Sequence, residues 1–94
     1  MKKCLYQYKN DKVGFFMDPF YLPYKDADVI EFVRQGVMTG NCPPNVEELS
    51  LYLFGIMDDK SGEFEYKHDF IVSLSEFKNE LRERSEKREK ASLQ

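Results

Sequence analysis

Apolar and polar residues alternate along parts of this chain and recur at helical spacing in others. Residues 2–8 alternate, and a turn signal at residues 10–11 separates them from a second apolar run at residues 13–17. Alternation, a turn and a further apolar run together indicate two antiparallel strands. The pattern therefore predicts a β-hairpin over residues 4–17.

The clearest helical pattern lies over residues 27–38. The apolar residues at helical spacing there are Val29, Phe32, Val33 and Val37. A stripe of this kind predicts an amphipathic helix whose apolar face packs on the rest of the protein. We expect Phe32 to point toward Leu51, Leu53 or Phe64, so that replacing its buried ring with alanine would cost roughly 3–5 kcal/mol.

The ends of this helix carry their own signals. Asp26 or Asp28 is expected to cap the start, and Glu31 follows Asp28 at the spacing of a capping box. Gly36 or Gly40 is expected to end the helix in the left-handed conformation. The preceding segment, residues 18–24, contains two prolines and is expected to be an irregular aromatic loop.

The second half of the chain predicts a further hairpin. Residues 51–57 are almost wholly apolar, which favours a central strand. Residues 58–62 are expected to form the turn, with Gly62 supplying a positive φ. Residues 63–67 alternate, which predicts a strand with aromatic rings on one face and charges on the other, continuing through residues 70–72. A single helical turn is expected at residues 45–49.

The predicted fold is α+β: a small antiparallel sheet of three to five strands with one packed helix. Residues 1–77 are expected to form this single domain. From Ser75 the chain becomes strongly charged, and residues 78–94 are expected to form a charged helix or a disordered tail.

The net charge of −3 hides an uneven distribution. Residues 1–13 sum to +3, residues 14–77 to −8 and residues 78–94 to +2. Tight binding to duplex DNA requires clustered lysine and arginine, which an acidic body does not provide. Binding to a single strand requires less charge, because bases also stack on aromatic side chains.

Two segments combine charge with features suited to single-stranded nucleic acid. The hairpin carries lysines among aromatic rings, and the tail carries arginines and lysines. The candidate nucleic-acid-binding residues are Lys2, Lys3, Tyr6, Tyr8, Lys9, Lys12, Phe15, Phe16, Arg82, Arg84, Lys87 and Arg88. The alternative is that these rings belong to the core, that the lysines are ordinary surface residues and that the tail only aids solubility.

The sequence contains no recognisable catalytic or metal-binding set. His68 is the only histidine and is expected at the surface, and Cys4 and Cys42 lack the spacing of zinc ligands. We therefore expect a non-enzymatic protein without a cofactor or metal. No apolar run approaches the roughly 20 residues of a membrane span, and no signal peptide is evident, so a cytoplasmic location is expected.

Several short motifs occur in a characteristic order over about residues 5–67. They are Asp11-Lys12-Val13-Gly14-Phe15, then Pro19-Phe20, the helix, Pro44 with Glu47-Glu48, and Leu51-Tyr52-Leu53-Phe54-Gly55-Ile56-Met57-Asp58 closed by Ser61-Gly62. This series resembles the small nonstructural protein of gokushoviruses, a branch of the microviruses. The chain departs from the family at Glu31, where an arginine would be expected before the helical phenylalanine.

The resemblance implies a DNA-binding protein of the host cytoplasm that assists synthesis or packaging of a single-stranded DNA phage genome. The implied partners are single-stranded DNA and a viral replication protein or procapsid. Apart from the resemblance, a second copy of the chain is also considered as a partner. A different hypothesis is an acidic interaction module that docks on a basic replication or capsid protein without touching DNA. Its support is a set of acidic residues: Asp26, Asp28, Glu31, Glu47, Glu48, Asp58 and Asp59.

Overall fold

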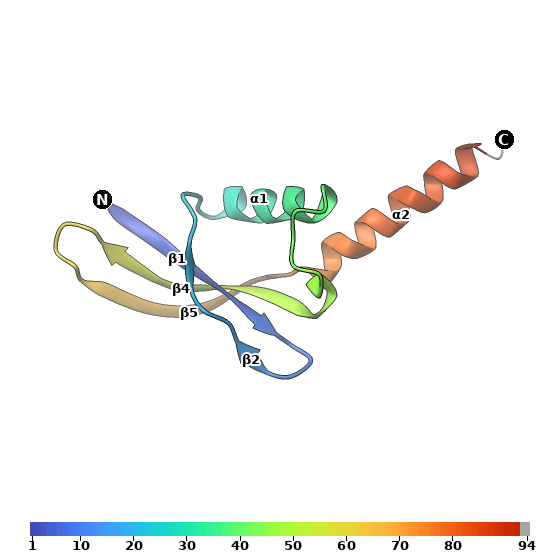
Figure 1. Ribbon diagram of the computed structural model, residues 1–94. Coiled ribbons are helices and arrows are strands. Elements are labelled where there is room, and N and C mark those ends of the chain that lie inside the picture. Colours follow the sequence, from blue (N-terminus) through green and yellow to red (C-terminus); the bar gives the residue numbers. More distant parts are fainter. Residues whose placement is uncertain (93–94) are drawn as a thin grey trace.

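A computed structural model of the chain describes the backbone of residues 1–92 and the side chains of residues 1–84. It has the predicted α+β fold, a curled antiparallel sheet accompanied by helices (Figure 1). In chain order the elements are β1 (Lys2–Asn10), β2 (Phe15–Phe16), β3 (Phe20–Tyr21), α1 (Ala27–Met38), the 3₁₀ turn η1 (Val46–Glu48), β4 (Leu49–Asp58), β5 (Phe64–Ser73) and α2 (Ser75–Ser92).

The sheet is five-stranded, and its strands run in the order β2-β1-β4-β5. β4 is central, as its apolar sequence predicted, and it pairs with β1 on one side and with β5 on the other. Both predicted hairpins form. Gly62 turns the β4–β5 hairpin with a φ of 77°, and its amide donates to the carbonyl of Asp58 at 2.8 Å.

The segment predicted to be an irregular loop contains a short strand. β3 pairs with β1 through Leu5 and Tyr6, on the same edge as β2. Pro19 and Pro23 lie outside the two paired residues, so neither proline has to donate a hydrogen bond within the ladder. The expectation for residues 18–24 was therefore wrong at Phe20–Tyr21.

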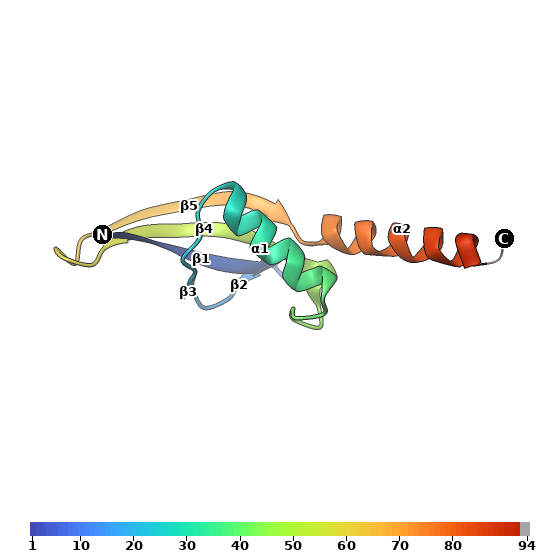
Figure 2. The same ribbon diagram turned by 90° about the horizontal axis from the view of Figure 1, so that it is seen from above.

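α1 lies across one face of the sheet and buries it (Figure 2). Val29, Val33 and Val37 supply the buried stripe of the helix, at intervals of four residues. The strands, η1 and the start of α2 complete the core with Cys4, Tyr6, Val46, Leu49, Leu51, Val72, Leu74 and Phe77. This side of the sheet is called the covered face below.

Two residues expected in this core lie elsewhere. Phe32 is 46% exposed and stacks on Tyr24 with ring centroids 4.8 Å apart. The reason is geometric: the valine stripe fixes the rotation of α1, and Phe32 lies about 100° around the helix from Val33. Phe64 is also exposed, because the register of β5 turns its ring to the opposite face of the sheet.

The predicted caps of α1 are wrong at its start and right at its end. Asp26 precedes the helix with a φ of 52° and makes no side-chain capping hydrogen bond. The carboxylate of Glu31 accepts hydrogen bonds from Arg34 and Gln35, so it does not complete a capping box. Gly40, with a φ of 81°, follows the helix, and its amide donates to the carbonyl of Val37.

The base of α2 docks on the covered side of the molecule. Phe77 enters the core, and Arg34 of α1 forms an ion pair with Glu80 at 2.6 Å. Arg82 pairs with Glu47 of η1. α2 then extends away from the sheet (Figure 1).

Candidate nucleic-acid interface

Among the described elements, no helix covers the sheet face opposite α1 (Figure 1). This face carries a row of aromatic rings. Alternation along β5 places Phe64, Tyr66 and Phe70 on this side. Tyr66 is 61% exposed and Phe70 is 58% exposed. The rings of this aromatic face, as it is called below, belong to Phe16, Tyr52, Phe54, Phe64, Tyr66, His68 and Phe70.

The rings contact one another across three strands. Tyr52 of the central strand has centroid distances of 5.3 Å to Phe16 of β2 and 5.6 Å to Phe70 of β5. His68 stacks nearly parallel to Tyr66, with centroids 5.7 Å apart and planes 13° apart. Aromatic pairs at these separations are attractive, and mutual contact restricts each ring. The face is thus a continuous aromatic platform rather than a set of isolated side chains.

A glycine makes room for the ring at one end of this platform. A Cβ at Gly55 would lie 2.2 Å from Cζ of Phe64 and 2.6 Å from the carbonyl oxygen of Glu65. Only a residue without a side chain leaves room for the ring of Phe64 over the strand at this point. Phe64 is then within 5.4 Å, centroid to centroid, of Phe54.

His68 sits at the centre of the platform in an unfavourable conformation. Its φ of 60° is rare for a residue with a side chain, although histidine tolerates it better than most. Its Nδ1 atom is buried and has no hydrogen-bond partner among the described residues. The β4–β5 register shifts next to it, between Leu53 and Gly55. Strain and unsatisfied polar atoms concentrate at functional sites.

Two lysines of β1 flank the rings. Lys9 Nζ lies 5.5 Å from the ring centroid of Phe16, and Lys3 Nζ lies 5.4 Å from that of Tyr21. These are cation–π distances, so each ammonium group is drawn over an aromatic surface. Of the predicted set, Lys9 and Phe16 lie at one end of the aromatic face, and Lys3 lies beside Tyr21 in the row that contains Met57 and Phe64.

The remaining candidates on β1 lie on the other side of the sheet. Tyr6 is only 2% exposed, and its hydroxyl donates to the carbonyl oxygen of Tyr24. Burial raises the pKa of both Tyr6 and Tyr8. Lys2 points to the covered face with them. For Tyr6 and Tyr8 the alternative was correct, because alternation along β1 places their rings beneath α1 and Phe20.

The other candidates are scattered. Phe15, the first residue of β2, is 72% exposed. Lys12 lies in the β1–β2 turn and pairs with Glu48 at 3.6 Å. Arg82 and Arg84 lie on α2 and pair with Glu47 and Glu80. The side chains of Lys87 and Arg88 lie outside the described residues. Lys12 of the hairpin and Arg82 of the tail therefore pair with adjacent residues of η1.

Sequence reasoning missed most of the aromatic face. Tyr52, Tyr66 and Phe70 were not among the candidates, and His68 was interpreted as an ordinary surface residue. The signal was present, since residues 64, 66, 68 and 70 are all rings at alternating positions. Alternation shows that such rings share a face but does not show which face the helix covers.

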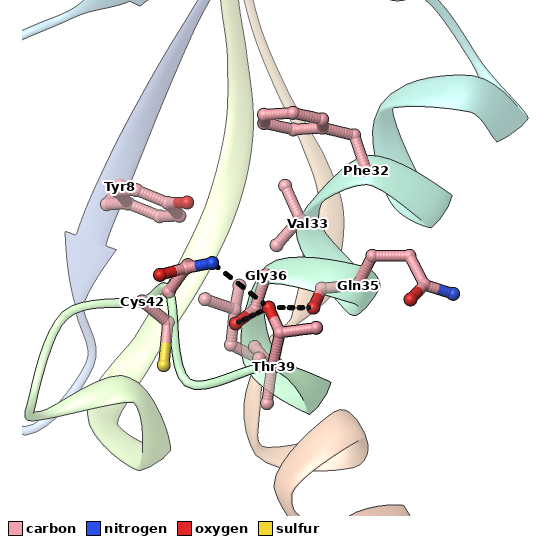
Figure 3. Close-up of a pocket in the computed structure, with 10 residues that line it drawn as sticks. Tyr8, Phe32, Val33, Gln35, Gly36, Thr39 and Cys42 are labelled. Atoms are coloured by element: carbon pink, nitrogen blue, oxygen red, sulfur yellow. Dashed lines mark hydrogen bonds between the residues drawn. The ribbon is translucent and has the colours of Figure 1, made fainter.

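A pocket of about 310 Å³ lies on the covered side, beside the end of α1 (Figure 3). Tyr8, Phe32 and Val33 line it together with the loop that contains Cys42. Two of its polar side chains are already engaged, because Thr39 donates to the carbonyl of Gln35 at 2.8 Å and Asn41 donates to Thr39 at 3.3 Å. It offers no charged group to a ligand, so the aromatic face is the stronger candidate.

Other kinds of site find less support. Over the described residues, no three histidine, cysteine, aspartate or glutamate side chains gather to hold a metal ion. None of the described helices combines the length and apolar character needed to cross a membrane.

No protein-family model matches the chain, and no curated protein and no solved structure matches it either. Its function must therefore be inferred from its own geometry.

Proposed function

We propose that this protein binds single-stranded DNA on the aromatic face and serves as a non-enzymatic accessory to single-stranded DNA genome synthesis or packaging in a phage. The DNA-binding part rests on one observation: an uncovered sheet face of mutually contacting rings flanked by Lys3 and Lys9. The phage role is the one that the gokushovirus resemblance implies, and it places the protein in the host cytoplasm with a replication protein or procapsid as partner.

Exposed rings on a sheet suit a single strand because its bases are free to stack. Each base stacked on an aromatic side chain contributes about 1–3 kcal/mol, with little dependence on sequence. In a duplex both faces of each base are already stacked on neighbouring bases, so the aromatic rings cannot stack on them. Several rings used together would supply useful affinity even where few phosphates are neutralised.

Part of the acidic body does not oppose this mode of binding, because the two acidic residues of β5 lie away from the rings. Glu65 and Asp69 of β5 pair in register with Ile56 and Leu53, which places them on the covered side. Asp11, at the hairpin end of the aromatic face, accepts a hydrogen bond from Ser50. The carboxylates of β5 would therefore not face a strand that lies over the rings, although Asp58 and Glu63 lie close to Phe64 at one end.

The hypothesis of an acidic docking module receives less support from the structure. Much of its acidic set is already used in internal pairs. Glu31 pairs with Arg34, Glu47 with Arg82, Glu48 with Lys12 and Asp59 with the terminal amino group. A carboxylate paired within the chain attracts a basic partner less strongly than a free one.

Fluorescence anisotropy with a labelled poly-dT oligonucleotide tests the proposal. We expect measurable binding at low salt that weakens as salt rises, and a loss of at least tenfold in affinity for the double variant Tyr66→Ala/Phe70→Ala. The matched control is Tyr24→Ala/Phe32→Ala, which removes a stacked and partly exposed aromatic pair from the other side of the molecule. Absent binding by the native protein, or equal losses in both double variants, would refute the proposal.

A further inference from the structure

The charges and the rings of the aromatic face occupy different strands. By register, residues on this side form successive rows across the sheet. Near the hairpin end, Lys9 pairs with Phe16, and at the other end Lys3 pairs with Met57, which pairs with Phe64. Between them lie the rows Gln7–Tyr52–Phe70 and Leu5–Gly55–Tyr66. Both lysines belong to β1, and the large rings of the inner rows belong to β4 and β5.

From this division we infer that a bound strand lies along the sheet with its sugar–phosphate backbone over β1 and its bases over β4 and β5. The inference rests on the proposed function and adds an orientation and a footprint to it. Lys3 and Lys9 would contact phosphates near the two ends of the bound segment. Tyr66, Phe70 and their neighbours would stack on the bases between those ends.

The spacing of the lysines sets the length of the bound segment. Lys3 and Lys9 are six residues apart on one strand, which corresponds to about 20 Å. Three rows contain rings on β4 or β5: the row of Tyr52 and Phe70, the row of Tyr66 and the row of Phe64. The face therefore accommodates about three stacked bases, similar to the two or three that the four-stranded sheet of an RNA-recognition motif stacks.

The inference separates two quantities that are measured independently. Phosphate contacts determine how steeply the affinity falls as the salt concentration rises. Stacking contributes to the affinity by an amount that does not depend on the salt concentration. With two phosphates neutralised on a single strand, the logarithm of the binding constant should fall against the logarithm of salt concentration with a slope of about −1.4. Removing one lysine should make that slope shallower by about 0.7.

The experiment is a set of salt titrations with dT oligonucleotides of increasing length. We expect Lys3→Gln and Lys9→Gln each to reduce the slope. Lys2→Gln is the matched control, because Lys2 neighbours Lys3 in sequence but faces the covered side, and it should leave the slope unchanged. Tyr66→Leu and Phe70→Leu should each weaken binding by roughly five- to 150-fold at every salt concentration, without changing the slope.

Affinity per molecule should stop rising once the oligonucleotide exceeds about four nucleotides, apart from the statistical gain of extra positions. If native protein binds but Lys2→Gln changes the slope as much as Lys9→Gln, the orientation is wrong and the proposed function still stands. A continued steep rise in affinity beyond eight nucleotides would likewise overturn only the footprint. If the native protein binds none of the oligonucleotides, both the orientation and the proposed function fail.

Discussion

The two faces of this sheet are both rich in aromatic side chains, but the rings are held in opposite ways. Tyr6 on the covered face is almost wholly buried, and its hydroxyl is satisfied by the carbonyl of Tyr24. Tyr66 on the other face is mostly exposed, and its neighbours are other rings. Contiguous exposed apolar patches are uncommon on monomeric proteins unless they bind something. The contrast separates rings that stabilise the fold from rings that are available to a ligand.

Rings and side chains that stabilise the fold and rings that are available to a ligand can be adjacent in sequence. Leu51 is completely buried against the helix side, whereas Tyr52 next to it contributes to the aromatic face. A strand with one buried side and one accessible side allows mutations to alter stability and binding independently. The following predictions use that property, from the largest expected effect on stability to the smallest.

Leu51→Ala should reduce the free energy of unfolding by about 2–5 kcal/mol, because it removes a fully buried side chain and leaves a cavity. Tyr66→Ala should cost less than about 1 kcal/mol, since its ring is mostly in water already. Urea denaturation of the two variants measures the difference. Similar losses in both would mean that the aromatic face is part of the core.

Gly55→Ala should destabilise the protein by about 1–3 kcal/mol, because the new methyl group collides with the ring of Phe64 and with a backbone carbonyl. Part of that cost should disappear in the double variant with Phe64→Ala, where the ring is absent. Unfolding free energies of the two single variants and the double variant give this coupling. Strictly additive effects would show that Phe64 does not lie over Gly55.

Phe32→Ala should cost only about 1 kcal/mol or less, in contrast to the 3–5 kcal/mol expected of a buried phenylalanine. The ring is nearly half exposed and packs mainly on Tyr24. Val33→Ala is the matched comparison from the adjacent, buried position of α1. Thermal unfolding should therefore show the larger shift for Val33→Ala, and the reverse order would place Phe32 in the core after all.

The ion pair that ties α2 to the covered side should produce a small pH dependence. The hydrogen bond from Arg34 holds the pKa of Glu80 below its ordinary value of 4.5. A carboxylate with a lowered pKa stabilises the folded state above its ordinary pKa, and that contribution is lost as pH falls through the lowered value. Below about pH 4.5, the melting temperature of Glu80→Gln should therefore depend less steeply on pH than that of the native protein. An unchanged acid profile would mean that the pair contributes nothing.

The sequence predicted the elements better than it predicted their faces. The helix over residues 27–38 and the central strand follow from strong periodic patterns, and both formed. The face of Phe32 did not follow, because Phe32 and Val33 are both apolar neighbours and only the packed valine stripe decides between them. The register shifts in β4–β5 and the left-handed His68 arise from tertiary pairing, which leaves no local signal.

The candidate site was also predicted only in part, because the sequence does not show which face of the sheet each strand residue occupies. Lysines among aromatic residues drew attention to β1, and Lys3 and Lys9 do flank the rings. Tyr6 and Tyr8 pack in the core or against it, as the alternative interpretation had it. The rings of β5 were too distant in sequence to be joined to the hairpin. Pairing through β4 brings them together, and that pairing is a property of the whole fold.

Backbone amide chemical shifts during titration with a dT oligonucleotide test the central claim most directly, because they show which face the ligand contacts. We predict that the largest perturbations fall on Lys9, Phe16, Tyr66 and Phe70, with little change at Val33 and Val37 of α1. Perturbations centred on α1 or α2, or none at saturating oligonucleotide, would contradict binding of a single strand to the aromatic face.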